Sequence, residues 1–387
     1  METKKPRQLE QHSQLTNYKE KRMETKKLID CCEFISDGDH LPPPKSDSGV
    51  PFITISNITG QNKLSFEDTM FVPESYYNGL NENKKAKKDD ILYSVVGSFG
   101  KPVYVDFDKQ MVFQRHIAIL RPKRNVNARF IYYTMLNPQF YKLVDKLAIG
   151  CSQRTVTLDT LRNIEVNLPD KDIQDKMVGI LSLIDEKIDI NNNVNDNLSA
   201  MAYDIYMHNF FSKKPNAKLK DILTESEKSA IQVGEAKTSN GEYPFFTSGA
   251  TILKWNEPFV DGRNCFLNTG GNADVKFYVG KAAYSTDTWS ISAKSEMSDY
   301  LYLMLFSIKP ELDQKFFQGT GLKHLQKPLL KDRPIYVPEK LELEAFNRQV
   351  IPMFDIISEN TRENQQLTSL RDWLLPMLMN GQATISD

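Results

Sequence analysis

The sequence has little of what a membrane, secreted or metal-binding protein requires. No apolar run reaches the roughly 18–20 residues of a membrane-spanning helix, and the first residues have no apolar segment of the kind found in secretory signals. Its four cysteines comprise the adjacent Cys31 and Cys32 and the distant Cys151 and Cys265. That spacing fits neither a zinc site nor a disulfide framework. We therefore expect a cytoplasmic protein without membrane association, whose cysteines are ordinary buried or half-buried side chains.

Net charge is also nearly absent, at −1 for 387 residues. A freestanding DNA-binding domain is usually basic, so this balance argues against tight DNA binding by the chain alone. It leaves open a local basic surface, or DNA binding that is shared with partner proteins. A content of 40% hydrophobic and 26% charged residues indicates a globular protein, and the length predicts two hydrophobic cores.

No catalytic motif is present. The five histidines lie in unrelated contexts. Residues 137–140 (Asn-Pro-Gln-Phe) resemble the Asn-Pro-Pro-aromatic motif of adenine methyltransferases, but the second proline and a glycine-rich cofactor loop are missing. Residues 97–101 (Gly-Ser-Phe-Gly-Lys) are too short for a phosphate-binding loop. The sequence therefore argues against an enzyme with its own active site.

What the sequence does contain is an internal repeat. Residues 150–169 align with residues 319–338 at an offset of 169 (319 − 150), and both segments begin with glycine and end with proline. Arg154 and Lys323 coincide, as do several aliphatic positions, and a long helical segment follows each proline. Such self-similarity predicts that one structural unit occurs twice.

The two long segments, residues 171–212 and 341–381, have apolar residues in steps of three and four, which predicts two coiled-coil-like helices. Each helix of about 40 residues would extend about 60 Å, and the simplest arrangement is an antiparallel pair; separate binding of each helix to other proteins is the alternative. Pro352 predicts a kink or a late start in the second helix. The residues expected to pack the helices together or to contact partners are Ile180, Ile184, Val194, Leu198, Ile357, Leu367, Leu370 and Leu374.

Polar residues interrupt both apolar stripes, at residues 191–193 and 360–366. Two interpretations remain open. The polar side chains either form a buried seam that fixes the register of the helices, or they line a solvated gap.

The remaining sequence divides into two globular domains, residues 23–170 and 213–340, flanked by an N-terminal extension (1–22) and a short tail (382–387). Short β-like runs precede one helix in each domain (127–147 and 298–308), which predicts an α+β fold. We expect two such domains in a pseudo-twofold arrangement, joined by the two long antiparallel helices. The predicted strands are residues 51–56, 90–96, 102–106, 115–120, 243–246, 265–268 and 276–279.

Polar and basic residues beside turns suit nucleic-acid binding, because glutamine can pair with adenine, arginine with guanine and lysine with phosphate. Residues 97–101 are expected to form a flexible tip. For every candidate the alternative is a solvent-facing loop residue. The candidates are Lys84, Lys85, Ser98, Phe99, Lys101, Gln114, Arg115, Gln153 and Arg154 in the first domain, and Thr247, Ser248, Asn268, Lys276, Lys323 and His324 in the second.

In these segments and their order, the chain resembles the specificity subunit of Type I restriction–modification systems. The resemblance covers nearly everything after residue 23. It departs from the family at Pro328 and Pro334, and where the usual Glu-Gln is replaced by Ile173-Gln174 and Leu343-Glu344. The segments that carry it are residues 90–100, 113–120, 184–190, 243–249 and 284–289 and the two repeated boxes.

The resemblance implies two target-recognition domains that each read one half of a split sequence in double-stranded DNA, with the paired helices as a ruler. It implies two methyltransferase (modification) subunits as partners, which methylate adenine using S-adenosylmethionine, and two restriction subunits, where these join, which cleave DNA with ATP and Mg²⁺. This chain would then hold no active site, cofactor or metal of its own. The alternative function is a coiled-coil scaffold with non-specific nucleic-acid binding.

Overall fold

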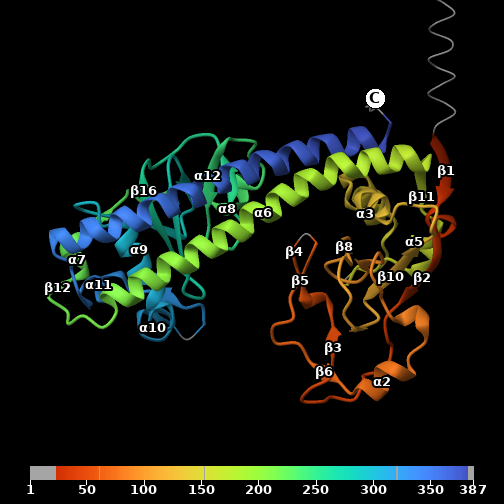
Figure 1. Ribbon diagram of the computed structural model, residues 1–387, viewed down its shortest axis with the longest axis horizontal. Coiled ribbons are helices and arrows are strands. Elements are labelled where there is room, and N and C mark those ends of the chain that lie inside the picture. The colour runs from red at the N-terminus through yellow and green to blue at the C-terminus, as the bar shows by residue number, and fades with distance from the viewer. Residues whose placement is uncertain (1–22, 61, 152, 320, 382–387) are drawn as a thin grey trace, which may run out of the picture. The chain divides into compact units, whose positions relative to one another are not determined.

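The computed structural model describes residues 23–60, 62–151, 153–319 and 321–381 (Figure 1). The extension 1–22 and the tail 382–387 lie outside the described residues. The chain divides into two compact units: unit 1 contains residues up to Asp185 together with those from Thr368 onward, and unit 2 contains Glu186–Leu367. Each unit thus contains one α+β domain and a segment of each long helix.

Unit 1 is built on a four-stranded antiparallel sheet in the order β2-β10-β7-β8. Its two central strands are almost wholly apolar and buried, because α3 covers one face and a second, smaller sheet lies near the other. The smaller sheet has the order β6-β3-β9, in which β3 and β9 run parallel. The strands are β1 (Met23–Lys27), β2 (Cys32–Asp37), β3 (Val50–Ile53), β4 (Ile58–Gly60), β5 (Lys63–Leu64), β6 (Phe71–Val72), β7 (Ile91–Ser94), β8 (Pro102–Tyr104), β9 (Val112–Phe113), β10 (Ile117–Pro122) and β11 (Glu165–Pro169).

The single helix predicted over residues 127–147 is wrong: the structure has two helices there. Asn137 ends α3, and its side chain then accepts a hydrogen bond from the Gln139 amide to cap α4. Pro138 supplies the first residue of α4, a position where proline's missing N–H costs nothing. The helical elements of this domain are η1 (Leu28–Cys31), η2 (Ile55–Asn57), α2 (Glu74–Gly79), η3 (Glu82–Lys84), α3 (Ala128–Leu136), α4 (Pro138–Leu147) and α5 (Leu158–Asn163).

Unit 2 repeats this topology, which confirms the duplication. Its four-stranded sheet has the order β13-β19-β16-β17, and its smaller sheet has the order β15-β14-β18 with β14 and β18 parallel. The strands are β12 (Ala217–Lys218), β13 (Leu223–Glu225), β14 (Tyr243–Phe246), β15 (Leu253–Trp255), β16 (Arg263–Asn268), β17 (Val275–Val279), β18 (Ala283–Tyr284), β19 (Thr288–Ala293), β20 (Phe317–Gln318), β21 (His324–Leu325) and β22 (Pro334–Ile335). The helices are α7 (Leu219–Ile222), α8 (Val233–Ala236), α9 (Ser298–Ser307), α10 (Lys309–Glu311), η4 (Leu312–Phe316) and α11 (Lys327–Lys331).

The two long helices are α6 (Lys171–Phe210) and α12 (Lys340–Met379), each of 40 residues. Each follows a short strand that pairs with the first strand of its domain, β11 with β1 and β22 with β12. The late start predicted from Pro352 is wrong, since α12 begins at Lys340 and continues through the proline. Pro352 is exposed, and the flanking Val350 and Phe354 are buried, so their packing holds the helix together despite the missing N–H.

The apolar contacts of the long helices agree in part with the predicted packing residues. In unit 1, Met177, Val178 and Leu181 of α6 share a cluster with Leu375 and Leu378 of α12. In unit 2 the buried residues are Ala202, Tyr206 and Phe210 of α6 with Phe346, Val350 and Phe354 of α12. Of the predicted packing residues, Ile184 is buried, Leu198, Ile357, Leu367 and Leu374 are half-buried, and Ile180, Val194 and Leu370 are exposed.

The polar middle of the helices forms a seam of hydrogen bonds in unit 2. Asn191 donates to Glu363 (2.7 Å) and to Asn364 (2.9 Å), Asn364 donates to Asn192 (3.0 Å), and Asn360 donates to Asn195 (2.8 Å). The pairs advance along α6 as they retreat along α12, so the helices run antiparallel here. Asn191 is itself buried. Of the two interpretations left open by the sequence, the polar seam is confirmed for these residues.

Candidate nucleic-acid interface

In each unit, three loops converge at one end of the four-stranded sheet. We call this the three-loop surface; it comprises residues 97–99, 114–116 and 150–155 (except 152) in unit 1 and residues 271–273, 285–287 and 319–324 (except 320) in unit 2. Two backbone hydrogen bonds hold the loops together in unit 1, from Gly97 to Arg154 (2.9 Å) and from Val95 to His116 (2.9 Å). Unit 2 has their counterparts, from Gly271 to Lys323 (3.0 Å) and from Thr269 to Asp287 (3.0 Å).

The glycines at the start of the two repeated boxes allow the same close approach of the backbone in both units. Gly150 and Gly319 have φ of +100° and +148°, in the region that favours glycine. A Cβ at either position would lie 2.6 Å from a backbone oxygen, that of Gln153 or that of Leu322. The chain therefore folds back on itself only because no side chain is present there. The alignment of the boxes in sequence thus reflects one loop conformation that occurs twice.

The last residue of β7 and the last residue of β16 each form a side-chain hydrogen bond that holds the following loop in place. Ser94 donates from Oγ to the Ser98 carbonyl (3.0 Å), and Asn268 donates from Nδ2 to the Asn272 carbonyl (3.2 Å). Ser98 and Asn272 are exposed at the tips of these loops. Asn272 therefore occupies the position in unit 2 that Ser98 occupies in unit 1.

In unit 1, a groove of about 310 Å³ lies between the turn that precedes β10 and the glycine loop. Arg115 is exposed at its rim, and its Nε donates to His116 Nε2 at 3.4 Å. Burial, with the nearby charges of Arg115 and His40, lowers the pKa of His116, which keeps its ring neutral and able to accept at neutral pH. Gln153 lines the other side of the groove and is exposed. A guanidinium, an imidazole and an amide on one surface can recognise base edges or phosphates.

The other candidates in unit 1 differ in accessibility. Ser98 and Lys101 are exposed. Gln114 is half-buried, and its backbone N–H donates to the Ile53 carbonyl. Phe99 does not form the flexible tip that we expected: it is buried and stacks on Tyr141, with 6.0 Å between ring centroids. Arg154 is half-buried, lies over the Phe99 ring and forms an ion pair with Asp145. Both residues therefore support the surface from beneath.

Of the two candidate lysines of residues 84–88, Lys84 lies beside the three-loop surface, because the carbonyl of its partner Asp39 accepts from the Arg115 amide (3.0 Å). Lys84 forms an ion pair with Asp39 (3.1 Å), and Lys85 is buried and forms an ion pair with Glu82 (2.9 Å). Hydrogen bonds from Tyr76 and Lys84 outweigh burial and lower the pKa of Asp39. Because both ammonium groups already have carboxylate partners, a role in binding phosphate is not favoured by their surroundings.

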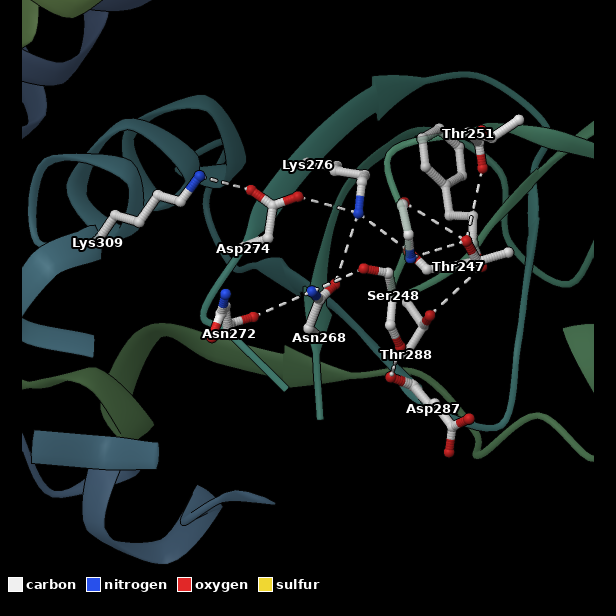
Figure 2. A network of polar contacts seen from close by, with 12 residues as sticks. Thr247, Ser248, Thr251, Asn268, Asn272, Asp274, Lys276, Asp287, Thr288 and Lys309 are labelled. Carbon is white, nitrogen blue, oxygen red and sulfur yellow. Dashed lines mark hydrogen bonds and ion pairs between the residues drawn. The ribbon is translucent and has the colours of Figure 1, made fainter. Parts of the chain in front are cut away.

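In unit 2, four candidates form a network that holds the loops from within (Figure 2). Lys276 donates to the Thr247 carbonyl (2.9 Å) and pairs with Asp274 (3.1 Å), and Asn268 donates to the Ser248 carbonyl (2.9 Å). Thr247 and Asn268 are buried. Burial opposes ionisation of Asp274, but the charges and hydrogen bonds of Lys309 and Lys276 lower its pKa. Thr247, Asn268 and Lys276 are thus directed at other protein groups.

Ser248 connects this network to the three-loop surface. Its hydroxyl donates to the Asp287 carbonyl (3.0 Å), while the Asp287 carboxylate points away from the network (Figure 2). Lys323 forms an ion pair with Asp313 (3.0 Å), whose pKa is lowered by that hydrogen bond, and His324 is exposed beside Gly270. Of the candidates in unit 2, the exposed His324 and the half-exposed Lys323 lie on the surface itself.

Sequence reasoning missed Asn272, Thr286, Asp287 and Leu322 in unit 2. Alignment of the two turns indicates Thr286 and Asp287, Leu322 lies in the repeated box opposite Gln153, and Asn272 is found only from its contact with Asn268. Residues 113–117 and 284–288 align at an offset of 171 (284 − 113), each starting with an aromatic residue. No group of three or more His, Cys, Asp or Glu that could hold a metal is found in the described part of the chain.

Comparison with known proteins agrees with this duplicated architecture. Residues 20–200 and 213–368 match the Type I restriction modification DNA specificity domain. The specificity subunit of the Type I restriction enzyme HindI from Haemophilus influenzae is 22% identical, over 77% of this chain and 87% of the relative. The MjaVIII specificity subunit from Methanocaldococcus jannaschii is 27% identical over 37% of this chain and 35% of the relative.

The fold is also similar to that of a Type I restriction–modification S subunit from M. genitalium, with a TM-score of 0.58 and 16% identity over 94% of this chain and 97% of the other. A duplicated α+β domain with two long helices thus defines a DNA-recognition protein. The chain belongs to the family of Type I restriction–modification specificity subunits, which recognise the DNA target and are not themselves catalytic. Among the described residues, no helix is long and apolar enough to cross a membrane.

Proposed function

We propose that each three-loop surface reads one half of a bipartite DNA target. The observation that supports this most directly is the duplicated backbone geometry, which presents different exposed side chains at equivalent positions of the two units. A reader of two unlike half-sites requires a constant frame with variable contacts. The residues proposed to contact DNA in unit 1 are Ser98, Lys101, Gln114, Arg115, His116 and Gln153, and in unit 2 Asn272, Thr286, Asp287, Leu322, Lys323 and His324.

The long helices are proposed to set the number of unread base pairs between the half-sites. Each is a continuous helix of 40 residues, about 60 Å long. The seam around Asn191 and Asn364 fixes their register, because a slip of either helix would leave the buried Asn191 amide without its partners. A fixed register gives a fixed length, as a ruler requires.

We propose further that two methyltransferase subunits dock on the chain, one for each unit. Two copies of one partner need two equivalent surfaces, and the repeat supplies them. Met201 of α6 and Leu370 of α12 are related by the offset of 169 (370 − 201), and both are exposed, by 52% and 44%. Large apolar side chains exposed at repeated positions are typical of interaction sites. Restriction subunits are expected to join the complex in addition.

We assign the methylation and cleavage reactions to these partner subunits. We expect the methyltransferase subunits to bind S-adenosylmethionine, and the restriction subunits to use ATP and Mg²⁺. This chain supplies base recognition and spacing, and we place the complex in the cytoplasm, where the DNA of the host cell is accessible.

The test is to express the full chain with its methyltransferase subunits and to locate methylated adenines in the host DNA. A split motif with a constant gap is expected, and Gly150→Ala and Gly319→Ala should each degrade recognition of a different half. Methylation without a split motif, or with both halves degraded by either variant, would contradict the proposal. A non-specific scaffold would give scattered methylation that neither variant alters.

A further inference from the structure

The turns that lead into β10 and β19 carry opposite charge. In unit 1 it contains Gln114, Arg115 and His116, and in unit 2 it contains Ser285, Thr286 and Asp287. Arg115 is the exposed residue of the first turn, and Asp287 is the exposed residue of the second. The two turns therefore differ in charge, although the exposed charges are not at the same position, since Arg115 matches Thr286 and His116 matches Asp287.

The backbone shows that these turns are structural counterparts. The first residue of each turn donates to the end of the central strand of the smaller sheet, Gln114 to Ile53 (2.9 Å) and Ser285 to Phe246 (2.9 Å). Each turn then closes with the same internal bond, from Ile117 to Gln114 (3.0 Å) and from Thr288 to Ser285 (3.0 Å). The difference between the units is thus confined to side chains on one common frame.

An exposed carboxylate on a surface that binds DNA has a specific consequence. It is repelled by phosphates, so it can be accommodated only where it accepts hydrogen bonds from a base. In the major groove, aspartate pairs with the N4 amino group of cytosine, whereas arginine pairs with O6 and N7 of guanine. Within the described part of the chain, neither Arg115 nor Asp287 forms an ion pair, so both charges are available for such contacts.

The turn in unit 2 is also rigid enough to select a base. The Asp287 carbonyl accepts from the Thr269 amide (3.0 Å) and from the Ser248 hydroxyl (3.0 Å), and Ser248 is held by Asn268. The network of Figure 2 thus fixes the backbone from which the carboxylate projects. Nearby, Leu322 is 66% exposed where the box of unit 1 has Gln153, which again places a different chemistry at a matching position.

We infer that Arg115 selects a guanine in the half-site read by unit 1 and that Asp287 selects a cytosine in the half-site read by unit 2. This assignment rests on the proposed function, because it requires the three-loop surfaces to face DNA. It adds the base class and the two residues that determine it. Each half-site then contains one G·C pair that is fixed by a single side chain.

Two substitutions test the inference, because each should change one base of the DNA sequence that the complex recognises. Glutamine and asparagine both pair with adenine, so Arg115→Gln should change the fixed guanine to adenine, and Asp287→Asn should change the fixed cytosine to adenine. The preference at that one pair should change by about 5- to 150-fold, while the other half-site stays as it was. The matched controls are Arg124→Gln and Glu257→Gln, exposed residues outside the three-loop surfaces, which should leave both half-sites unchanged.

The measurement is again the pattern of methylated adenines produced by the complex in cells, with circular dichroism and co-purification of the methyltransferase to show that each variant folds and assembles. A change confined to one G·C pair in the expected half supports the inference. Uniformly weaker methylation with an unchanged motif would overturn it and leave a phosphate contact, while the split motif would still support the proposed function. Loss of the split motif in the wild type would overturn both. If Asp287→Asn fails to assemble, Asp287→Ala provides the second variant. It should relax the base preference at that one pair, and an unchanged methylated motif would contradict the inference.

Discussion

The two units are most alike in the backbone hydrogen bonds that hold their loops. They differ most in the side chains that are exposed on those loops. Gly150 and Gly319 make the same close approach, and the loops around them are tied by the same amide–carbonyl pairs. Yet the exposed residues on those loops differ in charge and in polarity, as Gln153 and Leu322 do. The comparison indicates that the duplicated frame is preserved by backbone geometry, which leaves the side chains above it free to diverge.

The units also differ in how a half-buried arginine holds the sheet. In unit 1, Arg121 binds the buried Asp90 through two nitrogens (2.9 and 2.7 Å), within the domain. In unit 2, Arg263 of β16 binds Asp299 of α9 through two bonds of 2.6 Å and also Asp355 of α12 (2.5 Å). The pair in unit 2 therefore connects the sheet directly to a long helix, and the pair in unit 1 does not.

The largest effect is expected from breaking that connection. Arg263→Met leaves the Asp299 carboxylate buried without its partner, which should destabilise unit 2 by about 3–5 kcal/mol. Thermal unfolding followed by calorimetry measures the loss. Arg124→Met, an exposed arginine of unit 1, is the control and should change stability by less than about 0.5 kcal/mol.

The same variant gives a pH dependence. Burial raises the pKa of Asp299 above that of an unfolded carboxyl, and Arg263 opposes this rise. Because the folded state then binds the proton more tightly, the cost of ionised Asp299 is absent below the unfolded pKa and grows as pH rises. The defect of Arg263→Met should therefore be smaller at pH 5 than at pH 8, and a defect independent of pH would contradict this explanation.

The next effect tests whether the glycine loops act separately. Gly150→Ala and Gly319→Ala each place a Cβ 2.6 Å from a carbonyl oxygen at positive φ, which should cost about 1–3 kcal/mol. Gly179→Ala is the matched control, since Gly179 lies in α6 with no atom near its added Cβ and should gain about 0.5–1 kcal/mol. Chemical denaturation reports these changes, and equal behaviour of all three glycines would disprove the role of the loops.

An effect of similar size on stability is expected at the polar seam. Asn191→Ala removes two hydrogen bonds and leaves Glu363 and Asn364 without that partner, for a loss of about 1–3 kcal/mol. Exposed Asn193→Ala is the control. If the seam fixes register, the Asn191 variant should also broaden the range of gap lengths in methylated sites, whereas a single unchanged gap would argue against that role.

The smallest effect on folding, but a specific one on assembly, is expected at Met201 and Leu370. Met201→Asp and Leu370→Asp should each remove one methyltransferase copy while stability changes little, since both residues are exposed. Native mass spectrometry distinguishes complexes with one and two copies. Exposed Asp204→Ala is the control, and retention of both copies in the two variants would contradict docking at these residues.

The sequence predicted the duplication, the two long helices and the α+β class because glycine, proline and apolar spacing are local signals. It counted the exposed Ile180 and Val194 among the packing residues, because a stripe in steps of three and four leaves several faces possible until the domains cover one of them. Exposure of Phe99 and of Lys276 was predicted only from the composition of the segments around them. Phe99 is instead buried against Tyr141 and Lys276 donates to the Thr247 carbonyl, and both partners are distant in sequence.

The central claim is that two readers are held at a distance set by the helices. Its most direct test inserts four residues after Asn192 in α6 and four after Glu363 in α12, so that the antiparallel pair lengthens by about 6 Å. The methylated motif should keep both half-sites and gain roughly two base pairs in the gap, from a rise of about 3.4 Å per pair. An unchanged gap, or altered half-site sequences, would contradict the account.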